Sequence, residues 1–414
     1  MALEITAARP DPALLDLPWS TPLEEWPEDL LAAFPRGISR HIVRFVKISG
    51  RVVAIKEIKT DIARREYEML RNLRRLGLPA VEPWAVVAGR VTPAGDPIDG
   101  CLITRHLQFS LPYRALYSQS LRRGTASRLI DALAVLLVRL HLAGFWWGDV
   151  SLSNTLFRRD AGAFAAYLVD AETGELREQL SDGQREHDLD IARVNIAGEL
   201  MDLEAGGLLQ EDRDPVEVSE RIMTRYRELW QELTGTEIVD TGERWRVDER
   251  VRRLNDLGFD VGELEMTTDI GGTSIQIHPK VVDAGHNSRR LLRLTGLDVR
   301  ENQARRLLND LDAYRSYFGR QADDEESVAF DWLREIYEPL TRTVPPELPR
   351  KIEPAEFFHE LLEHRWYLSE RHQRDFSLEE VKADYLTHVL PTKPDEKDVL
   401  GVDTVEMPVI ASED

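Results

Sequence analysis

The sequence predicts an α+β fold in which a strand-rich part with one helix precedes a helical part. Residues 37–59 hold β-branched, alternating stretches split at Ser49-Gly50, which is typical of a β-hairpin. Residues 61–79 carry apolar side chains at helical spacing and end in a Gly-Leu-Pro sequence. Two further strands are predicted within 85–107, followed by a long helix over 125–144. Because the strands come first and the helices later, two unequal lobes are expected, not a repeated βαβ unit.

The composition is that of a water-soluble globular protein with more than one domain. The chain has 414 residues, of which 42% are hydrophobic and 31% are charged. Its net charge of −21 disfavours nucleic acids and anionic membranes as partners. The single cysteine cannot form an internal disulfide, and the start of the chain lacks the pattern of a signal peptide. The longest apolar stretch, residues 129–147, contains charged residues and is too polar for a membrane span. We therefore expect a cytoplasmic protein.

Shifts in composition divide the chain into five parts. Residues 1–36 are Pro-rich and contain two Trp, so they are expected to form an arm that packs on the body. The strand-rich lobe is placed at 37–107 and the helical lobe at 108–235. Residues 236–390 are expected to form a separate, mostly helical domain that also contains a strand-like stretch. Residues 391–414 hold seven acidic residues and two Lys and are expected to be a disordered tail.

Five polar residues match the needs of phosphoryl transfer from ATP. Lys56 ends the strand-like "RVVAIK" and offers an ammonium for phosphate, and Glu66, ten residues later in the next helix, could hold it. Asp149 and Asn154 lie five apart on a polar loop, and Asp170 follows an apolar strand. Carboxylate and amide oxygens are suitable ligands for Mg²⁺. Each residue alone is more often a solvated terminus, but the ordered set of five indicates a functional site.

These segments resemble the protein-kinase-like superfamily. "LHLAGFWWGDVSLSN" (140–154) is similar to its L-H-x-x-G-x-x-H-G-D-x-x-x-x-N catalytic loop, in the style of the RIO and lipopolysaccharide (Kdo/WaaP) kinases and the aminoglycoside phosphotransferases. "VAIK" and "LVDAETG" resemble the kinase V-A-I-K strand and the metal-binding D-F-G segment. The resemblance covers about residues 30–235 and implies a bilobal protein-kinase-like fold. "PWSTPLEEWP", "RGISRHIVRFV" and "LEHRWYLSER" resemble a bacterial family that joins a lipopolysaccharide-kinase-like domain to a C-terminal domain of unknown function.

The resemblance implies a role for each of the five residues and implies ATP and Mg²⁺ as cofactors. Asp149 would orient the attacking hydroxyl, and Asn154 and Asp170 would bind Mg²⁺. Lys56, paired with Glu66, would hold the α- and β-phosphates. His141, from the L-H-x-x-G part of the motif, would be structural.

The sequence departs from the family pattern in three places. Position 147 is Trp where the family has His, so an indole N–H replaces an imidazole and can donate but not accept. Asp170 is followed by Ala-Glu in place of Phe-Gly, which leaves the metal role open to it. The phosphate-covering glycine loop is reduced to "PRGISRH" (35–41).

Within this reduced loop, Gly37 could allow close backbone approach to a nucleotide, and Ser39, Arg40 or His41 could contact its phosphates. The alternative is a plain turn that leads into the following strand.

Asp188 and Asp190 open a predicted helix where kinases carry a buried Asp that braces the catalytic loop. Capping of the helix N-terminus would explain one of them equally well.

A His-Glu pair and two Arg pairs in the C-terminal part are expected to have structural roles. His359 and Glu363 lie four apart on a predicted helix, but the second His of an H-E-x-x-H zinc motif is missing. The Arg pairs at 289–290 and 305–306 are expected to form ion pairs with local acids. A basic patch for RNA or for a phosphorylated partner is the alternative.

The sequence thus favours an ATP-dependent phosphotransferase that acts on a hydroxyl of a protein or a small molecule. The C-terminal domain would recruit or shape the substrate, which makes it the expected place for a protein partner. A kinase-like scaffold that binds ATP without turnover is the first alternative. A nucleic-acid-associated factor that works through the C-terminal domain is the second.

Overall fold

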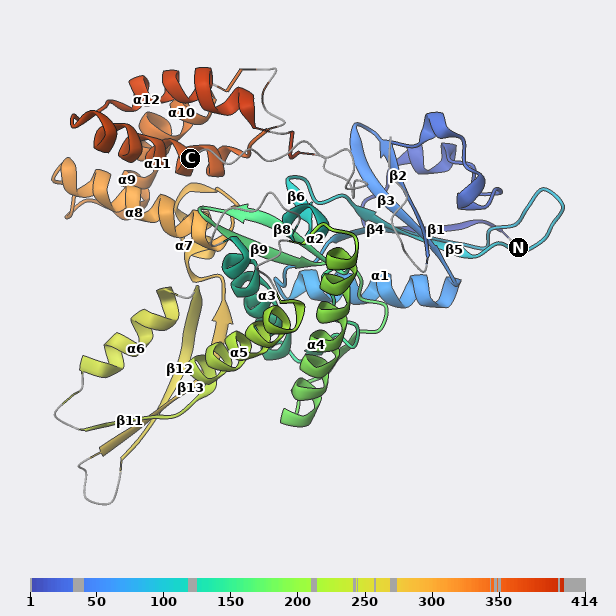
Figure 1. The fold of residues 1–414 in the computed structure, drawn as a ribbon, viewed down its shortest axis with the longest axis horizontal. Coiled ribbons are helices and arrows are strands. Elements are labelled where there is room, and N and C mark those ends of the chain that lie inside the picture. Colours follow the sequence, from blue (N-terminus) through green and yellow to red (C-terminus); the bar gives the residue numbers. More distant parts are fainter. Residues whose placement is uncertain are drawn as a thin grey trace. The chain divides into compact units, whose positions relative to one another are not determined.

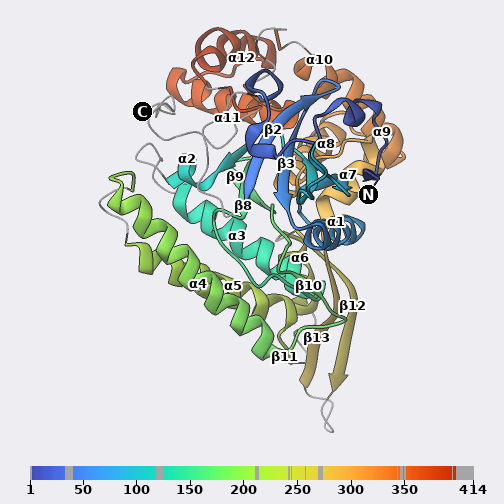
Figure 2. The same ribbon diagram turned by 90° about the vertical axis from the view of Figure 1, so that its right-hand side faces the viewer.

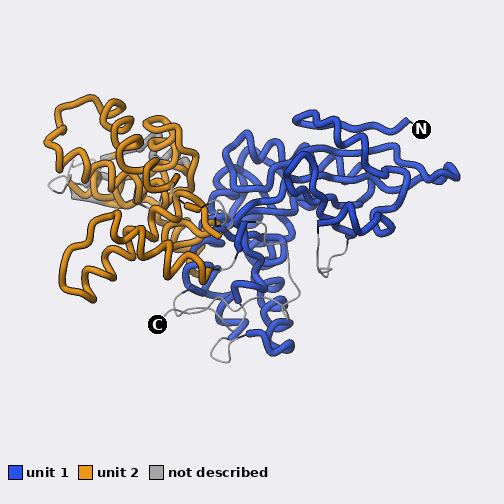
Figure 3. Tube along the Cα trace, turned by 90° about the horizontal axis from the view of Figure 1, so that it is seen from above, with its two compact units in different colours: residues 1–158, 166–223, 395–414 blue, residues 159–165, 224–394 orange. Residues whose placement is uncertain are grey.

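The computed structural model describes residues 2–32, 41–117, 125–209, 214–240, 243, 245–256, 258–268, 274–342, 344–345, 348, 351–393 and 395–397. The chain divides into two compact units, coloured separately in Figure 3. Unit 1 comprises residues 1–158, 166–223 and 395–414, and unit 2 comprises residues 159–165 and 224–394. The division after residue 223 falls earlier than the expected boundary at 235, because α5 (Pro215–Thr234) is shared between the units.

An antiparallel five-stranded sheet forms the N-terminal part of unit 1 (Figure 1). Its strands, in the order β1-β4-β5-β3-β2, are β1 (Glu4–Ala7), β4 (Glu82–Ala88), β5 (Gly100–Arg105), β3 (Arg51–Ile58) and β2 (Ile42–Ile48). The predicted hairpin is formed by β2 and β3. Ser49 and Gly50 have φ of 47° and 78°, as a two-residue hairpin turn requires.

The helix predicted over 61–79 is α1 (Thr60–Arg75), which packs on β4 and β5. Its buried face consists of Ala63, Glu66, Tyr67, Leu70 and Leu73, at the i, i+3, i+4 spacing of an amphipathic helix. Glu66 is the one carboxylate on this face, so it faces the sheet and not solvent.

The N-terminal segment packs on the same sheet. Besides β1 it forms the 3₁₀ turns η1 (Pro12–Asp16), η2 (Leu23–Glu25) and η3 (Glu28–Leu30). Trp19 and Trp26 are buried in one cluster with side chains of β2 to β5. The buried guanidinium of Arg90 donates to the carbonyls of Trp19 and Thr21 and pairs with Glu57 of β3 at 2.5 Å. An arm that packs on the body was expected from the two Trp.

The second part of unit 1 is mainly helical, as expected. It contains β6 (Ser110–Pro112), α2 (Tyr113–Tyr117), α3 (Thr125–Leu142), β7 (Phe145–Trp146), β8 (Thr155–Asp160), β9 (Ala163–Leu168), β10 (Glu175–Leu176) and α4 (Asp182–Ala205). Strands β6, β8 and β9 form a three-stranded sheet, and β7 pairs with β10. A capping box of Ser181 and Gln184 begins α4, so Asp188 and Asp190 lie inside this helix and do not open it.

Unit 2 combines a small sheet with a helical bundle. The sheet has the order β11-β13-β12, from β11 (Glu237–Asp240), β13 (Ser274–Ala284) and β12 (Phe259–Thr268), so the strand-like stretch is a hairpin. The helices are α6 (Trp245–Asp256), α7 (His286–Thr295), α8 (Glu301–Tyr317), α9 (Glu325–Trp332), α10 (Glu338–Thr341), α11 (Pro354–His372) and α12 (Leu378–Asp384). Short helical turns η5 (Leu333–Tyr337), η6 (Tyr385–Val389) and η7 (Leu390–Thr392) complete it. Trp332, Phe357 and Phe358 lie in its core.

The start of the expected disordered tail makes contacts. The ammonium of Lys351 donates to the carbonyl of Pro391 at 3.2 Å. Lys393 pairs with Glu360, and the amide of Phe109 donates to the carbonyl of Lys397. Residues 398–414 lie outside the described residues.

Candidate active site

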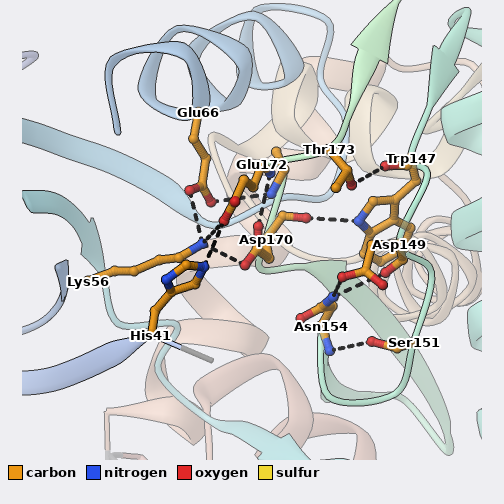
Figure 4. Close-up of polar contacts among 11 residues, drawn as sticks. His41, Lys56, Glu66, Trp147, Asp149, Ser151, Asn154, Asp170, Glu172 and Thr173 are labelled. Atoms are coloured by element: carbon orange, nitrogen blue, oxygen red, sulfur yellow. Dashed lines mark hydrogen bonds and ion pairs between the residues drawn. The ribbon is translucent and has the colours of Figure 1, made fainter. Parts of the chain in front are cut away.

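Lys56 is the centre of a partly buried cluster of charges. It lies within β3, two residues before its end, and is flanked by β2 and β5 through Val43 and Leu102. Its ammonium lies 3.1 Å from Glu66 Oε2, 2.7 Å from Asp170 Oδ2 and 3.1 Å from Glu172 Oε2 (Figure 4). The structure therefore brings together Lys56, Glu66 and Asp170 from three separate segments of the chain.

Glu66 is held in an environment that disfavours its charge. Its side chain is 1% exposed, and this burial raises its pKa to about 8, with the nearby charge of Asp170 acting in the same direction. Lys56 and the amide of Ala171 act against this by donating to the carboxylate. The raised pKa favours the protonated form of Glu66 at neutral pH.

The cluster carries more negative than positive charge. Burial would lower the pKa of Lys56, but the attraction of Glu66 and Asp170 outweighs it and raises this pKa, so the ammonium stays charged. Carboxylate oxygens of Glu66, Asp170 and Glu172 lie within 4.8 Å of one another. Three carboxylates around one ammonium form an oxygen-rich, anionic site, which fits a hard divalent cation such as Mg²⁺.

Asp149 and Asn154 meet on the loop between β7 and β8. The side-chain amide of Asn154 donates to Asp149 Oδ2 and to the Asp149 carbonyl, both at 3.1 Å. This leaves the amide oxygen of Asn154 directed away from Asp149. Asn195, on α4, donates to Asp149 Oδ1 at 3.3 Å. Two amides therefore fix the orientation of the Asp149 carboxylate (Figure 4).

Trp147 connects this loop to the segment that carries Asp170. Its indole is fully buried, and Nε1 donates to the carbonyl of Asp170 at 2.8 Å. In return, the hydroxyl of Thr173 donates to the carbonyl of Trp147 at 2.7 Å. The indole thus supplies one hydrogen bond at the position where the family pattern has His.

Asp188 braces the loop that carries Asp149. Its fully buried carboxylate accepts from the amides of Trp147 and Gly148, at 2.8 and 2.7 Å, and lies 3.1 Å from His141 Nε2. His141 and Asp188 join α3 to α4, which lie close together in Figures 1 and 2. Asp190 has a side chain that is 70% exposed and faces Arg193 at 3.9 Å. Of the two interpretations left open, the brace is right for Asp188 and N-capping is wrong for both.

Three residues of the site were not found by sequence reasoning. Glu172 binds Lys56, Asn195 holds Asp149, and Glu199 accepts from the amides of Leu152 and Ser153. Asn195 and Glu199 follow Asp188 by seven and eleven residues, so all three share one face of α4. Polar residues at this helical spacing, among apolar residues that are buried, were the sequence signal that could have identified Asn195 and Glu199.

The expected phosphate loop falls mostly outside the described residues. Gly37, Ser39 and Arg40 are not among them, whereas His41 is. The imidazole of His41 lies 3.1 Å from Glu172 Oε2 (Figure 4). His41 is therefore near the Lys56 cluster, and its contact with phosphate stays a prediction.

Both C-terminal features considered in the sequence make polar contacts. His359 faces Glu363 at 3.3 Å, and no group of metal-ligating side chains other than Glu66, Asp170 and Glu172 occurs among the residues that the structure describes. Arg290 pairs with Glu325, as the ion-pair interpretation predicted.

Models of two protein families match two separate parts of the chain. Residues 46–197 match the model of the lipopolysaccharide kinase (Kdo/WaaP) family. Residues 46–197 are a Kdo/WaaP-family domain. Residues 228–390 match a domain of unknown function, DUF4032, so the chain joins a Kdo/WaaP domain to a DUF4032 domain. The antiparallel sheet with α1, followed by a helical part, is the kinase-like architecture expected of such a domain.

Among solved structures, the chain is similar to one described as WaaP in complex with acyl carrier protein. The two are 16% identical, the match covers 62% of this chain and 99% of the other, and the TM-score is 0.36. No curated protein matched the chain. Within the described ranges, none of the helices has both the length and the apolar character needed to cross a membrane.

Proposed function

We propose that the Kdo/WaaP domain transfers the γ-phosphoryl group of Mg-ATP to a hydroxyl group of a protein or small-molecule substrate. The observation that carries this proposal is the arrangement in Figure 4. Lys56 is bound by Glu66 and Asp170, and Asp170 is tied through Trp147 to the loop that orients Asp149 and Asn154.

Lys56 supplies the positive charge for the triphosphate. The raised pKa keeps its ammonium charged at neutral pH, and Glu66 fixes its position from α1. Glu172 also binds this ammonium in the structure, so ATP phosphates would replace one carboxylate contact. A point charge on a rigid inner strand suits phosphate binding.

Asn154 and Asp170 have the donor chemistry to hold Mg²⁺, with Glu172 nearby as a further acid. When bound there, Mg²⁺ would offset the charge on the phosphate oxygens. Asn154 presents an amide oxygen because its nitrogen is used by Asp149. Asp170 is held at its backbone by the indole of Trp147, which restricts where its carboxylate can lie.

Asp149 is suited to orient the substrate hydroxyl and accept its proton. Asn154 and Asn195 each donate to one of its carboxylate oxygens, so its orientation is set before substrate arrives. Preorganisation of this kind is what phosphoryl transfer requires of a protein, since the reaction depends on positioning and charge.

The test measures transfer of radiolabelled γ-phosphate from ATP, in the presence of Mg²⁺, to the protein itself and to water. Asp149→Ala and Asp170→Ala are expected to lower the rate by about 100-fold or more. Asp190→Ala is the matched control, because that exposed carboxylate lies on α4 away from the loop and should leave the rate unchanged. Transfer that survives both active-site changes would overturn the assignment.

A kinase-like scaffold without turnover is the second candidate. It is favoured by the third carboxylate on Lys56, since Glu172 occupies a contact that phosphate would need. Thermal stabilisation by Mg-ATP without any transfer of label would support the scaffold and contradict the phosphotransferase.

A further inference from the structure

Asn154 and Asp170 lie at the two ends of one hairpin. Asn154 immediately precedes β8, and Asp170 follows β9 by two residues. The amide of Val169 donates to the carbonyl of Asn154 at 3.0 Å, which joins the two ends. Six residues of strand at about 3.3 Å each place the tip roughly 20 Å from these ends. The tip, residues 159–165, belongs to unit 2.

The turn at the tip is strained. Ala161 and Gly162, with φ of 49° and 78°, form the two-residue connection between β8 and β9. A positive φ is costly for Ala, by about 1–2 kcal/mol, because its Cβ crowds the backbone. Such a conformation persists where surrounding contacts enforce it. Here the amide of Ala161 donates to Glu356 Oε2 of α11 at 2.9 Å.

Asp160 caps a helix from a distant part of the chain. Its carboxylate accepts from the amides of Asn302 and Gln303, at 3.2 and 2.8 Å, and from the Asn302 side chain at 3.0 Å. These amides belong to the first turn of α8, whose N-cap residue is Arg300. Since an Arg side chain cannot accept a hydrogen bond, Asp160 supplies the acceptor that this helix end lacks.

Two further buried contacts hold the tip. Glu356 accepts from the side chain of Gln303 at 2.8 Å as well as from Ala161. Arg300 donates to the carbonyl of Arg159 at 2.7 Å and pairs with Glu353. Asp160, Gln303 and Glu356 are each at most 5% exposed. Buried polar groups that hydrogen-bond one another are costly to separate, so these contacts hold the tip within unit 2.

We propose that the DUF4032 domain, through Asp160, positions Asn154 and Asp170 and thereby sets the affinity of the kinase site for Mg²⁺. This rests on the proposed function and assigns the C-terminal domain a part in it. Asp160 is a positioning residue, because its contacts are with α8 and not with reacting atoms. Groups that orient metal ligands from outside commonly change metal affinity by about 10- to 100-fold.

The experiment uses the full chain and measures the Mg²⁺ concentration for half-maximal ATP turnover, together with kcat. Asp160→Ala is expected to raise that concentration about tenfold, and Asp160→Asn, which keeps one acceptor oxygen, to raise it less. The control is Asp310→Asn, which alters a partly buried carboxylate on α8, the helix that Asp160 caps. Asp310 accepts from the indole of Trp332 of α9, at 2.8 Å. It should lower stability and leave the Mg²⁺ dependence unchanged.

Hydrogen–deuterium exchange gives a readout that does not need activity. Asp160→Ala should speed amide exchange along the whole hairpin, including residues 167–172 beside the site, whereas Asp310→Asn should speed it only in the unit 2 helices. If Asp160→Ala prevents folding, Glu356→Gln, which keeps an acceptor for Ala161, gives the same comparison in milder form.

Unchanged exchange at residues 167–172 in the Asp160 and Glu356 variants, or an equal change in Asp310→Asn, would overturn the proposal. Should the wild-type chain transfer no phosphate, the proposed function fails, and the exchange pattern still decides whether the hairpin links the DUF4032 domain to Asn154 and Asp170.

Discussion

The pKa values of Glu66 and Lys56 are set by burial and by the excess of carboxylates around one ammonium. Glu66 lies on the buried face of α1, and Lys56 has three carboxylate neighbours. A buried ion pair often stabilises a fold no more than well-packed apolar side chains of similar size. The retained charge is therefore best explained by a need to bind another charged group.

The raised pKa of Glu66 predicts a specific dependence of stability on pH. Between its ordinary value near 4.5 and about 8, the folded state holds a proton that the unfolded state has released. The contribution of Glu66 to the free energy of unfolding thus falls as pH rises through this range, by at most about 1.4 kcal/mol per pH unit.

Urea unfolding of the wild type and of Glu66→Gln, without Mg²⁺ and at several pH values from 5 to 8, measures this contribution. The variant should gain stability relative to the wild type as pH rises. A difference that is constant over this range would contradict the raised pKa.

The hydrogen bond from the Trp147 indole to the Asp170 carbonyl can be tested by substitution, with the adjacent Trp146 as a control. Trp147→Phe leaves the Asp170 carbonyl without its donor, which should cost about 1–3 kcal/mol and lower phosphate transfer. Trp146→Phe is the control, because the buried indole nitrogen of Trp146 donates to no acceptor in the described part of the chain. Equal losses of activity in the two variants would show that the hydrogen bond to Asp170 has no role.

Among the elements of the fold, the helix α4 fixes the loop that carries Asp149 and Asn154. Asp188, Asn195 and Glu199 project from one face of α4 and together hold the loop by its backbone amides and by Asp149. A loop fixed in this way does not have to become ordered when substrate binds, which lowers the entropic cost of reaching the reactive geometry.

The brace can be tested with two Asp residues of the same helix. Asp188→Asn leaves at least one of the amides of Trp147 and Gly148 without an acceptor and should reduce the free energy of unfolding by about 1–3 kcal/mol. Asp190→Asn should change it by less than about 0.5 kcal/mol, because that side chain is exposed. Chemical denaturation of both variants measures the difference, and similar values would contradict the brace.

For the whole molecule, the net charge disfavours one of the alternative functions, binding to nucleic acid. A net charge of −21 repels nucleic acid, and Arg290 is paired with an acid. We therefore expect no binding of a 20-nucleotide RNA in fluorescence anisotropy at physiological salt. Binding that weakens steeply with added salt would instead support a nucleic-acid-associated role for the DUF4032 domain.

Structural features were predictable from the sequence where the interacting residues are close together along the chain, and not where they are far apart. The β2–β3 hairpin, α1 and α3 were predicted because turn residues and apolar spacing are local signals. Lys56 and Asp170 were predicted because their chemistry is tied to recognisable motifs.

Glu172 and Asp160 could not be predicted in the same way. Glu172 meets Lys56 across 116 residues, and Asp160 caps a helix more than 140 residues away. Nothing in their neighbouring residues indicates such partners. The sequence also contained no sign that the division between the two units lies within α5, because this is one uninterrupted helix.

The most direct test of the central claim is a crystal structure of the full chain with Mg²⁺ and a non-hydrolysable ATP analogue. The metal should lie on the side-chain oxygens of Asn154 and Asp170, with the Lys56 ammonium on the phosphates and Asp149 facing the γ-phosphate. A nucleotide bound elsewhere, or one whose phosphates contact neither Lys56 nor a metal held by Asp170, would contradict it.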